Sequence, residues 1–204
     1  MTEVLKVNDP GSHKRAAELI EKGGVIVYPT ETLYGIGAAA LNGDAVKKVF
    51  EVKGRPEGVP IPVLVRDMGM LAGIAELNDT ALTLAENFWP GALTLIVREK
   101  GKLPGLITAG TGKVAVRISA HEFVKTLFES VEGALTSTSA NVSGGENLLG
   151  FAQIHETFNG KVDLIVDSGN IPPSLGSTVL DTTVNPPQIL REGDITIDTI
   201  KEFI

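Results

Sequence analysis

The short apolar run from Val25 to Val27, together with the loop and helix that follow it, constrains the fold of this chain most strongly. Consecutive β-branched residues predict a buried strand, and Pro29, which has no N–H to donate, ends its ladder. Apolar residues then recur at helical spacing over 45–50, after Asp44 as the expected N-cap and before Gly54, the usual C-terminal glycine. A strand that leads through a loop into a helix is the unit of α/β domains.

The same alternation continues along the chain. Strand patterns cover residues 4–7, 61–65, 92–98, 114–118, 134–138, 162–166, 178–180 and 188–190, and helical patterns cover 12–22, 67–75, 79–88, 120–130, 151–158 and 196–203. Several late strands follow one another directly, which favours a mixed sheet. We therefore expect one α/β domain over residues 1–204, with a twisted mixed sheet flanked by helices.

Composition excludes several classes of protein. The chain has no cysteine, so disulfides, thiolate metal sites and cysteine nucleophiles are excluded. It has no apolar run near the ~20 residues of a membrane span and no signal-peptide pattern at its start, so we expect a cytoplasmic protein without a membrane partner. The net charge of −7 and the isoelectric point near 5.0 argue against tight RNA binding, which usually needs a basic surface.

Two glycine-containing runs resemble nucleotide-binding motifs, but each lacks residues that its motif requires. The run Gly110 to Lys113 lacks the first glycine of a phosphate loop, because position 107 is isoleucine, and it lacks the hydroxyl residue after the lysine. The run Gly35 to Gly37 lacks the third glycine of the dinucleotide fingerprint. The long glycine-rich segment 99–112 leaves two interpretations open, a functional lid or a disordered excursion.

The polar residues at strand and helix ends are better candidates for a site. Lys53 and Arg55 lie at a helix exit, where they can hold an anion or be ordinary surface charges. Arg117 lies within the predicted strand 114–118 and Arg191 follows the predicted strand 188–190, and each can bind a carboxylate or face solvent. The hydroxyl-rich run 136–143 can bind phosphate or form an ordinary turn. The three histidines have no metal-ligand spacing, so we expect no metal site in the protein itself.

Several of these motifs together resemble a known family. The run from Pro29 to Gly37 followed by Lys53-Gly54-Arg55-Pro56 is similar to the YrdC-like threonylcarbamoyl-adenylate synthases. Further matches, in the family's order, are Trp89-Pro90-Gly91 with Leu93-Thr94, Val116-Arg117, Ser139-Ala140-Asn141 with Ser143-Gly144, Gly176-Ser177-Thr178-Val179 with Asp181, and Arg191 with Gly193. The resemblance implies a YrdC-like fold with a concave ligand site, in the short form without a further domain.

The resemblance also implies an activity and a set of site residues. The reaction joins L-threonine, bicarbonate and ATP into threonylcarbamoyl-AMP with release of pyrophosphate, for N6-threonylcarbamoyladenosine formation in tRNA. Mg²⁺ would come with ATP, and a tRNA-modifying transferase would accept the product, with tRNA itself bound weakly or indirectly. The implied residues are Lys53 and Arg55 for catalysis and the phosphates, Ser139, Asn141 and Arg191 for the rest of ATP, and Thr32, Arg117, Ser137 and Ser177 for threonine.

The sequence departs from the family at three positions, and two other classes of function stay open. Val59, Leu64 and Thr138 stand where relatives often have a polar residue, a histidine and a proline. No side chain is an obvious general base, and Glu31 is the nearest candidate. The alternatives are a non-catalytic RNA-binding module of the same fold and a carbamoyl-transfer domain of the hydrogenase-maturation type.

Overall fold

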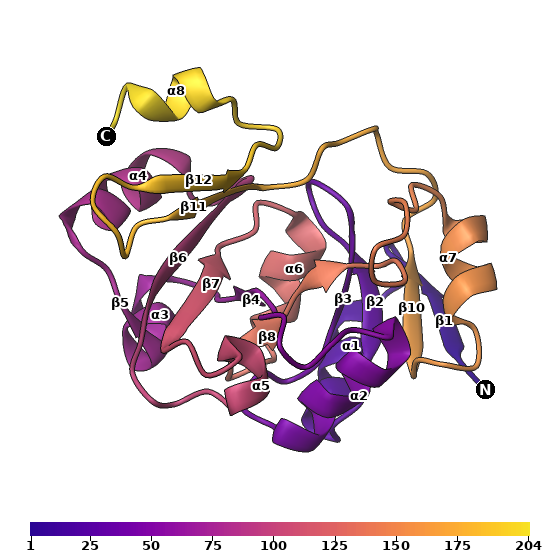
Figure 1. Cartoon of the computed structure of the whole chain (residues 1–204). Helices are drawn as coiled ribbons and strands as arrows, with labels where there is room; N and C mark the ends of the chain where they lie inside the picture. Colours follow the sequence, from indigo (N-terminus) through magenta and orange to yellow (C-terminus); the bar gives the residue numbers. More distant parts are fainter.

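The computed structural model describes residues 1–204 as an α/β structure (Figure 1). The helices are α1 (Ser12–Glu21), α2 (Gly43–Lys53), α3 (Met68–Ile74), α4 (Asp79–Phe88), α5 (Gly105–Thr108), α6 (Glu122–Leu127), α7 (Phe151–Phe158) and α8 (Ile197–Lys201). The strands are β1 (Glu3–Lys6), β2 (Ile26–Pro29), β3 (Tyr34–Gly37), β4 (Val63–Leu64), β5 (Ala75–Glu76), β6 (Leu93–Glu99), β7 (Lys113–Arg117), β8 (Leu135–Thr136), β9 (Thr138–Ser139), β10 (Leu164–Asp167), β11 (Thr178–Asp181) and β12 (Gln188–Arg191). The predicted mixed α/β class is confirmed.

The strands divide between two mixed sheets, where the sequence predicted one. The first sheet has the order β1-β10-β2-β3-β9, and the second has the order β12-β11-β6-β7-β4-β8, with β5 paired to β6. Parallel pairs join β1 to β10 and β10 to β2 in the first sheet, and β11 to β6 and β4 to β7 in the second. Figure 1 shows β6 and β7 on one side of the molecule and β2, β10 and β1 on the other. Both sheets therefore contribute strand ends to the space between them.

The predicted strand over 134–138 is two strands in different sheets. β8 pairs with β4 in the second sheet, whereas β9 pairs with β3 in the first. Ser137 lies between them, and its backbone N–H donates to the carbonyl of Pro62 at 2.7 Å. The sequence pattern did not reveal this break, because a chain that passes from one sheet to the next keeps the same run of strand-forming residues. The crossing brings Ser137 and Ser139 to the junction of the sheets.

Helices cover the sheets and close two apolar clusters. The larger cluster contains buried residues of α2, α4, β6 and β7, including Val46, Leu84, Leu95 and Val116. The smaller one lies between α1, α6 and the first sheet. None of the helices combines the length and the apolar character that crossing a bilayer requires. The fold is thus held by these two apolar clusters, while polar side chains collect at strand ends.

The start of α2 differs from the prediction by two residues. The helix begins at Gly43, and its N-cap is Asn42, whose Oδ1 accepts hydrogen bonds at 3.1 Å from the N–H groups of Asp44 and Ala45. Asp44, the predicted cap, instead lies in the first turn, where its carboxylate stabilises the positive end of the helix dipole. The predicted end is confirmed, because Gly54 is the C-cap in the left-handed conformation.

The segment 99–112 is ordered rather than a disordered excursion, and its role as a lid stays a prediction. β6 extends to Glu99, and α5 forms within the segment with Ile107 fully buried. The carbonyl of Ile107 accepts a hydrogen bond from the N–H of Ile61 at 3.1 Å. Leu103 and Ile107 supply the apolar surface that a helix this short needs to form, so tertiary packing fixes a segment that its glycines alone would leave mobile.

Gly37, the last residue of β3, carries the first testable prediction. A side chain at this position would collide with the backbone carbonyl of Thr136, and Ala38 is hydrogen-bonded to Thr136 on the same crossing. Because a backbone carbonyl cannot move aside like a side-chain end, we expect Gly37→Ala to lower the free energy of unfolding by about 3 kcal/mol. Urea denaturation measures this free energy of unfolding.

Gly73→Ala in α3 is the control, since nothing lies within 4 Å of its added carbon, and it is expected to raise the free energy of unfolding by up to about 1 kcal/mol. Equal stabilities for the two variants would contradict the argument.

Candidate functional site

A cleft of about 750 Å³, including the open solvent in its mouth, lies where the strand ends of the two sheets meet. Its lining contains three arginines and no acidic side chain, although the chain has 25 Asp and Glu residues. The polar lining residues are Thr30, Thr32, Tyr34, Arg55, Thr94, Arg117, Ser137, Thr138, Ser139, Ser177 and Arg191. A cleft with this lining concentrates positive charge and hydroxyl donors, so it favours anionic ligands within an acidic protein.

Strand ends position most of these side chains. The loop between β2 and β3 supplies Thr32, the end of β7 supplies Arg117, and the end of β12 supplies Arg191. Ser177 immediately precedes β11. Residues at strand ends are held in place by the pairing of the sheet while their side chains remain accessible, which is the usual position of a ligand site in α/β proteins.

The turn after β2 is fixed by Thr30. Its Oγ1 accepts hydrogen bonds from the backbone N–H groups of Thr32 and Leu33 at 3.2 Å each, and it donates to the carbonyl of Leu33 at 2.6 Å. Such a threonine turn replaces backbone pairing where Pro29 ends the strand. It holds Glu31 and Thr32 in the direction of β7.

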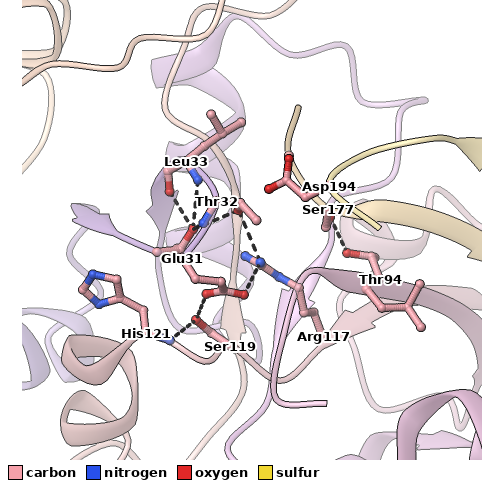
Figure 2. A network of polar contacts seen from close by, with 12 residues as sticks. Glu31, Thr32, Leu33, Thr94, Arg117, Ser119, His121, Ser177 and Asp194 are labelled. Carbon is pink, nitrogen blue, oxygen red and sulfur yellow. Dashed lines mark hydrogen bonds and ion pairs between the residues drawn. The ribbon is translucent and has the colours of Figure 1, made fainter. Parts of the chain in front are cut away.

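Arg117 is at the centre of a polar network (Figure 2). Its side chain is buried, and its Nη1 donates to Oε1 of Glu31 at 2.7 Å and to Oγ1 of Thr32 at 3.3 Å. The other carboxylate oxygen of Glu31 accepts a hydrogen bond from the Ser119 hydroxyl, and that hydroxyl accepts one from the N–H of His121 at 3.2 Å. Arg117 is thus a carboxylate-binding arginine rather than a solvent-facing one.

Arg191 holds the loop before β11. Its Nε and Nη2 donate to the carbonyl of Ser177 at 3.1 and 2.6 Å, and Nη2 also lies 3.2 Å from the Ser177 hydroxyl. That hydroxyl is bonded in turn to Oγ1 of Thr94 at 2.7 Å. Burial, and then the charge of Arg117, lower the pKa of Arg191, because removing cations from water and placing them together both oppose protonation. Arg191 and Arg117 therefore converge on one region of the cleft.

Arg55 is held at the other edge of the lining by backbone oxygens. Its Nε and Nη2 donate to the carbonyls of Val59 and Pro60 at 3.1 and 2.6 Å. Burial lowers its pKa, and it forms no ion pair. Val59, one of the departures from the family pattern, therefore contributes its carbonyl to the position of Arg55, while its side chain is exposed.

Lys53 and Asn141 lie beside the cleft but do not line it. The Lys53 ammonium donates to the carbonyls of Ser139 and Asn141 at 2.5 and 2.7 Å and to Oδ1 of Asn141 at 3.3 Å. These bonds use all three donors of the ammonium, which leaves none for a phosphate in this arrangement. Burial, assisted by the charge of Arg55, lowers the pKa of Lys53 to about 8. Lys53 therefore acts as a clamp, meaning that its ammonium joins the end of α2 to Ser139 and to the loop after β9.

The structure brings seven of the nine predicted site residues into one cleft and leaves Lys53 and Asn141 outside its lining. Their roles toward particular ligands stay predictions. The sequence indicated no ligand contact for Thr94 or Ser119. Thr138 belongs to the run 136–143, for which phosphate binding was left open. Thr94 lies near the start of β6, and this position at a strand end is the one signal that would have indicated it.

No group of three His, Asp or Glu side chains lies close enough together to hold a metal ion. A divalent ion needed by a nucleotide reaction would enter on the nucleotide phosphates, which supply the oxygen ligands that Mg²⁺ prefers.

Comparison with known proteins agrees with these features. The family model Sua5/yciO/yrdC, described as "Telomere recombination", matches residues 18–193. The chain is 40% identical over 190 residues to a threonylcarbamoyl-AMP synthase of Pyrococcus abyssi, covering 93% of this chain and 56% of that protein. It is 37% identical to the protein of the same name from Bacillus subtilis, covering 100% of this chain and 59% of that protein.

This chain belongs to the Sua5/YciO/YrdC family. It spans between half and two thirds of the length of the two relatives just described. A solved structure of the Pyrococcus abyssi Sua5 protein, complexed with L-threonine, superimposes with a TM-score of 0.93 at 36% identity and covers 100% of this chain and 61% of that one. The resemblance inferred from the strand-end motifs is thereby confirmed, and so is the fold class.

Proposed function

We propose that this protein is a threonylcarbamoyl-AMP synthase, an ATP-using nucleotidyltransferase that serves tRNA modification. The observation that carries the proposal is the cleft in which three arginines and several hydroxyls converge without any acidic lining residue. Threonine, bicarbonate and ATP are all ligands with anionic groups, so a site that joins them must concentrate cations. The names of the relatives and the threonine complex of the Pyrococcus protein support the same reaction.

The proposed reaction needs threonine and ATP in adjoining parts of the cleft. Threonine would bind between Thr32, Arg117 and Ser177, with its carboxylate on the guanidinium of Arg117. The nucleotide would bind along Arg55, Ser139 and Arg191, and Mg²⁺ would arrive on its phosphates. Arg191 touches Ser177, so the two parts share a wall at this contact.

Two bond-forming steps complete the reaction. The threonine amine attacks the carbon of bicarbonate, or of CO₂ formed from it, and a carbamate results with loss of water. A carbamate oxygen then forms a bond to the α-phosphorus of ATP, and the bond from that phosphorus to the bridging oxygen breaks, with pyrophosphate taking the electron pair. The residues of the cleft would contribute position and charge neutralisation, which are the main sources of rate in phosphoryl-type transfers.

Glu31 does not fit the role of a general base in its observed position, because both of its oxygens are already engaged by Arg117 and Ser119. We therefore assign no protein base to the amine attack. We further infer a cytoplasmic location and a tRNA-modifying transferase as acceptor of the product, since the product is an activated intermediate of tRNA modification. The net charge of −7 favours delivery to such an enzyme over direct binding of tRNA.

Pyrophosphate release by the purified protein tests the proposal. With Mg²⁺ present, release is expected only when ATP, threonine and bicarbonate are all supplied, and omission of either threonine or bicarbonate is expected to abolish it. The product should appear with the mass of a threonylcarbamoyl adenylate. Release that needs neither threonine nor bicarbonate would contradict the proposal, as would no release together with tight, salt-dependent binding of tRNA.

A further inference from the structure

The three arginines of the cleft differ in how their charges are compensated. Arg117 forms an ion pair with Glu31 at 2.7 Å, whereas Arg55 and Arg191 donate only to uncharged oxygens. Glu31 does not line the cleft itself, and 19% of its side chain is exposed. The cleft thus contains one cation that a carboxylate of the protein neutralises and two cations that no carboxylate of the protein pairs with.

We propose that Glu31 determines specificity by making Arg117 itself selective for the carboxylate of a zwitterionic amino acid over phosphate. This inference rests on the proposed function, in which threonine and the nucleotide occupy the same cleft. Glu31 is a positioning residue in this proposal, because it acts through Arg117 and touches neither substrate.

The hydrogen bonds around Arg117 support this role. Only its Nη1 is bonded within the protein, to Glu31 and Thr32. Its Nε and Nη2 have no protein partner, and since no buried polar side-chain atom in the structure lacks one, these two atoms are accessible to solvent. Nε and Nη2 form the edge of a guanidinium that binds a carboxylate through two parallel hydrogen bonds. Glu31 therefore occupies one side of Arg117 and leaves the carboxylate-binding edge open.

The network behind Glu31 keeps this arrangement rigid. The Ser119 hydroxyl donates to the second oxygen of Glu31 and is itself held by the N–H of His121 (Figure 2). On the other side, the turn organised by Thr30 fixes the backbone of Glu31. The carboxylate thus cannot turn away from Arg117 without breaking bonds at both oxygens, so its compensation of the arginine is a fixed property of the site.

Charge then separates the two substrates. A zwitterionic amino acid has no net charge and needs only hydrogen-bond donors for its carboxylate, which the open edge of Arg117 supplies. A phosphate group carries close to two negative charges and binds best where several cations are uncompensated. The paired Arg117 offers little net attraction to it, while Arg55 and Arg191 offer their full charges. Without Glu31, pyrophosphate groups would compete with threonine for Arg117.

Binding of threonine in the presence and absence of pyrophosphate tests this inference. We would compare the wild-type protein, Glu31→Gln and the matched control Glu122→Gln by calorimetry. Glu122 is one residue from His121, lies on α6 and is largely exposed, so its replacement removes a nearby negative charge without touching Arg117. Pyrophosphate is expected to change threonine affinity by less than about twofold in wild type and control, and to weaken it about tenfold in Glu31→Gln.

Each outcome of this experiment decides the inference. Affinity for ATP unchanged in Glu31→Gln, with new competition between pyrophosphate and threonine, would support it. Competition between pyrophosphate and threonine that is equal in all three proteins would overturn it, and so would an equal loss of ATP and threonine affinity in Glu31→Gln. A loss of about 100-fold in kcat with unchanged binding would also overturn it, because it indicates a general base. If the wild-type protein binds threonine but pyrophosphate affects the wild type and Glu31→Gln equally, only this inference is refuted. A wild-type protein that binds no threonine refutes the proposed function as well.

Discussion

Replacement of Arg117 by alanine is expected to lower kcat/KM for threonine by roughly 100-fold or more, as measured by threonine-dependent pyrophosphate release. The variant loses the one guanidinium edge that is open for a carboxylate, and it leaves the carboxylate of Glu31 without its cation. Because Glu31 is partly shielded from water, the free energy of unfolding is also expected to fall, by about 2 kcal/mol, less than for a fully buried pair. Urea denaturation measures that loss separately from activity.

Two further variants keep this prediction falsifiable if the alanine variant folds poorly. Arg117→Lys retains the charge but not the planar fork, so we expect an intermediate loss, chiefly in KM for threonine. Arg66→Ala is the control, because Arg66 is exposed and pairs only with the equally exposed Asp67, and it is expected to leave activity and stability nearly unchanged. Full threonine-dependent activity in Arg117→Ala would show that threonine does not bind at this arginine.

The second large effect is expected for Lys53→Met. Methionine keeps the length and apolar stem of the side chain but removes the three donors that hold Ser139 and Asn141. Buried carbonyls left without a donor each cost about 1–3 kcal/mol, while relief of a buried charge offsets part of that, so we expect a net loss of about 2 kcal/mol in stability. Pyrophosphate release is expected to fall at least tenfold, with the larger change in KM for ATP, because Ser139 lines the part of the cleft proposed to bind the nucleotide.

The dependence of this effect on pH follows from the lowered pKa of Lys53. As pH rises through about 8, the Lys53 ammonium loses a proton and with it one of its three hydrogen bonds. Wild-type activity is therefore expected to decline above this pH. The residual activity of Lys53→Met is expected to stay constant over the same range. Stability changes in the opposite direction. An unfolded lysine keeps its proton up to about pH 10.4, so between pH 8 and 10 the unfolded state binds more protons, and this residue's contribution to the stability of the folded state rises with pH.

Activity profiles and urea denaturation at several pH values measure both parts of the prediction. Lys48→Met is the matched control, since Lys48 belongs to the same helix and also donates to a backbone carbonyl, that of Gly23 at 2.8 Å, but is exposed and far from the cleft. It is expected to show the wild-type activity profile. A wild-type profile that is flat from pH 7 to 9, or a Lys53→Met profile that keeps the decline, would show that Lys53 is not the clamp described above.

The amino-acid sequence by itself determined the alternation of strands and helices, the mixed α/β class and the positions where the polar residues collect. These are local properties: β-branched runs, helical spacing and strand-ending prolines act through neighbouring residues. α7 (Phe151–Phe158) coincides with its predicted range, and α4 with its own. The family also followed from the sequence, because its motifs are runs of adjacent residues.

Only the tertiary structure decided which polar groups meet and which charges are compensated. The division into two sheets, the crossing at Ser137 and the burial of Ile107 depend on contacts between residues far apart in the chain. The same is true of the pair between Glu31 and Arg117, which are 86 residues apart, and of the bonds by which Lys53 holds a loop instead of facing the cleft. A residue type fixes what a side chain can donate or accept, but the partner that receives the bond is set by folding.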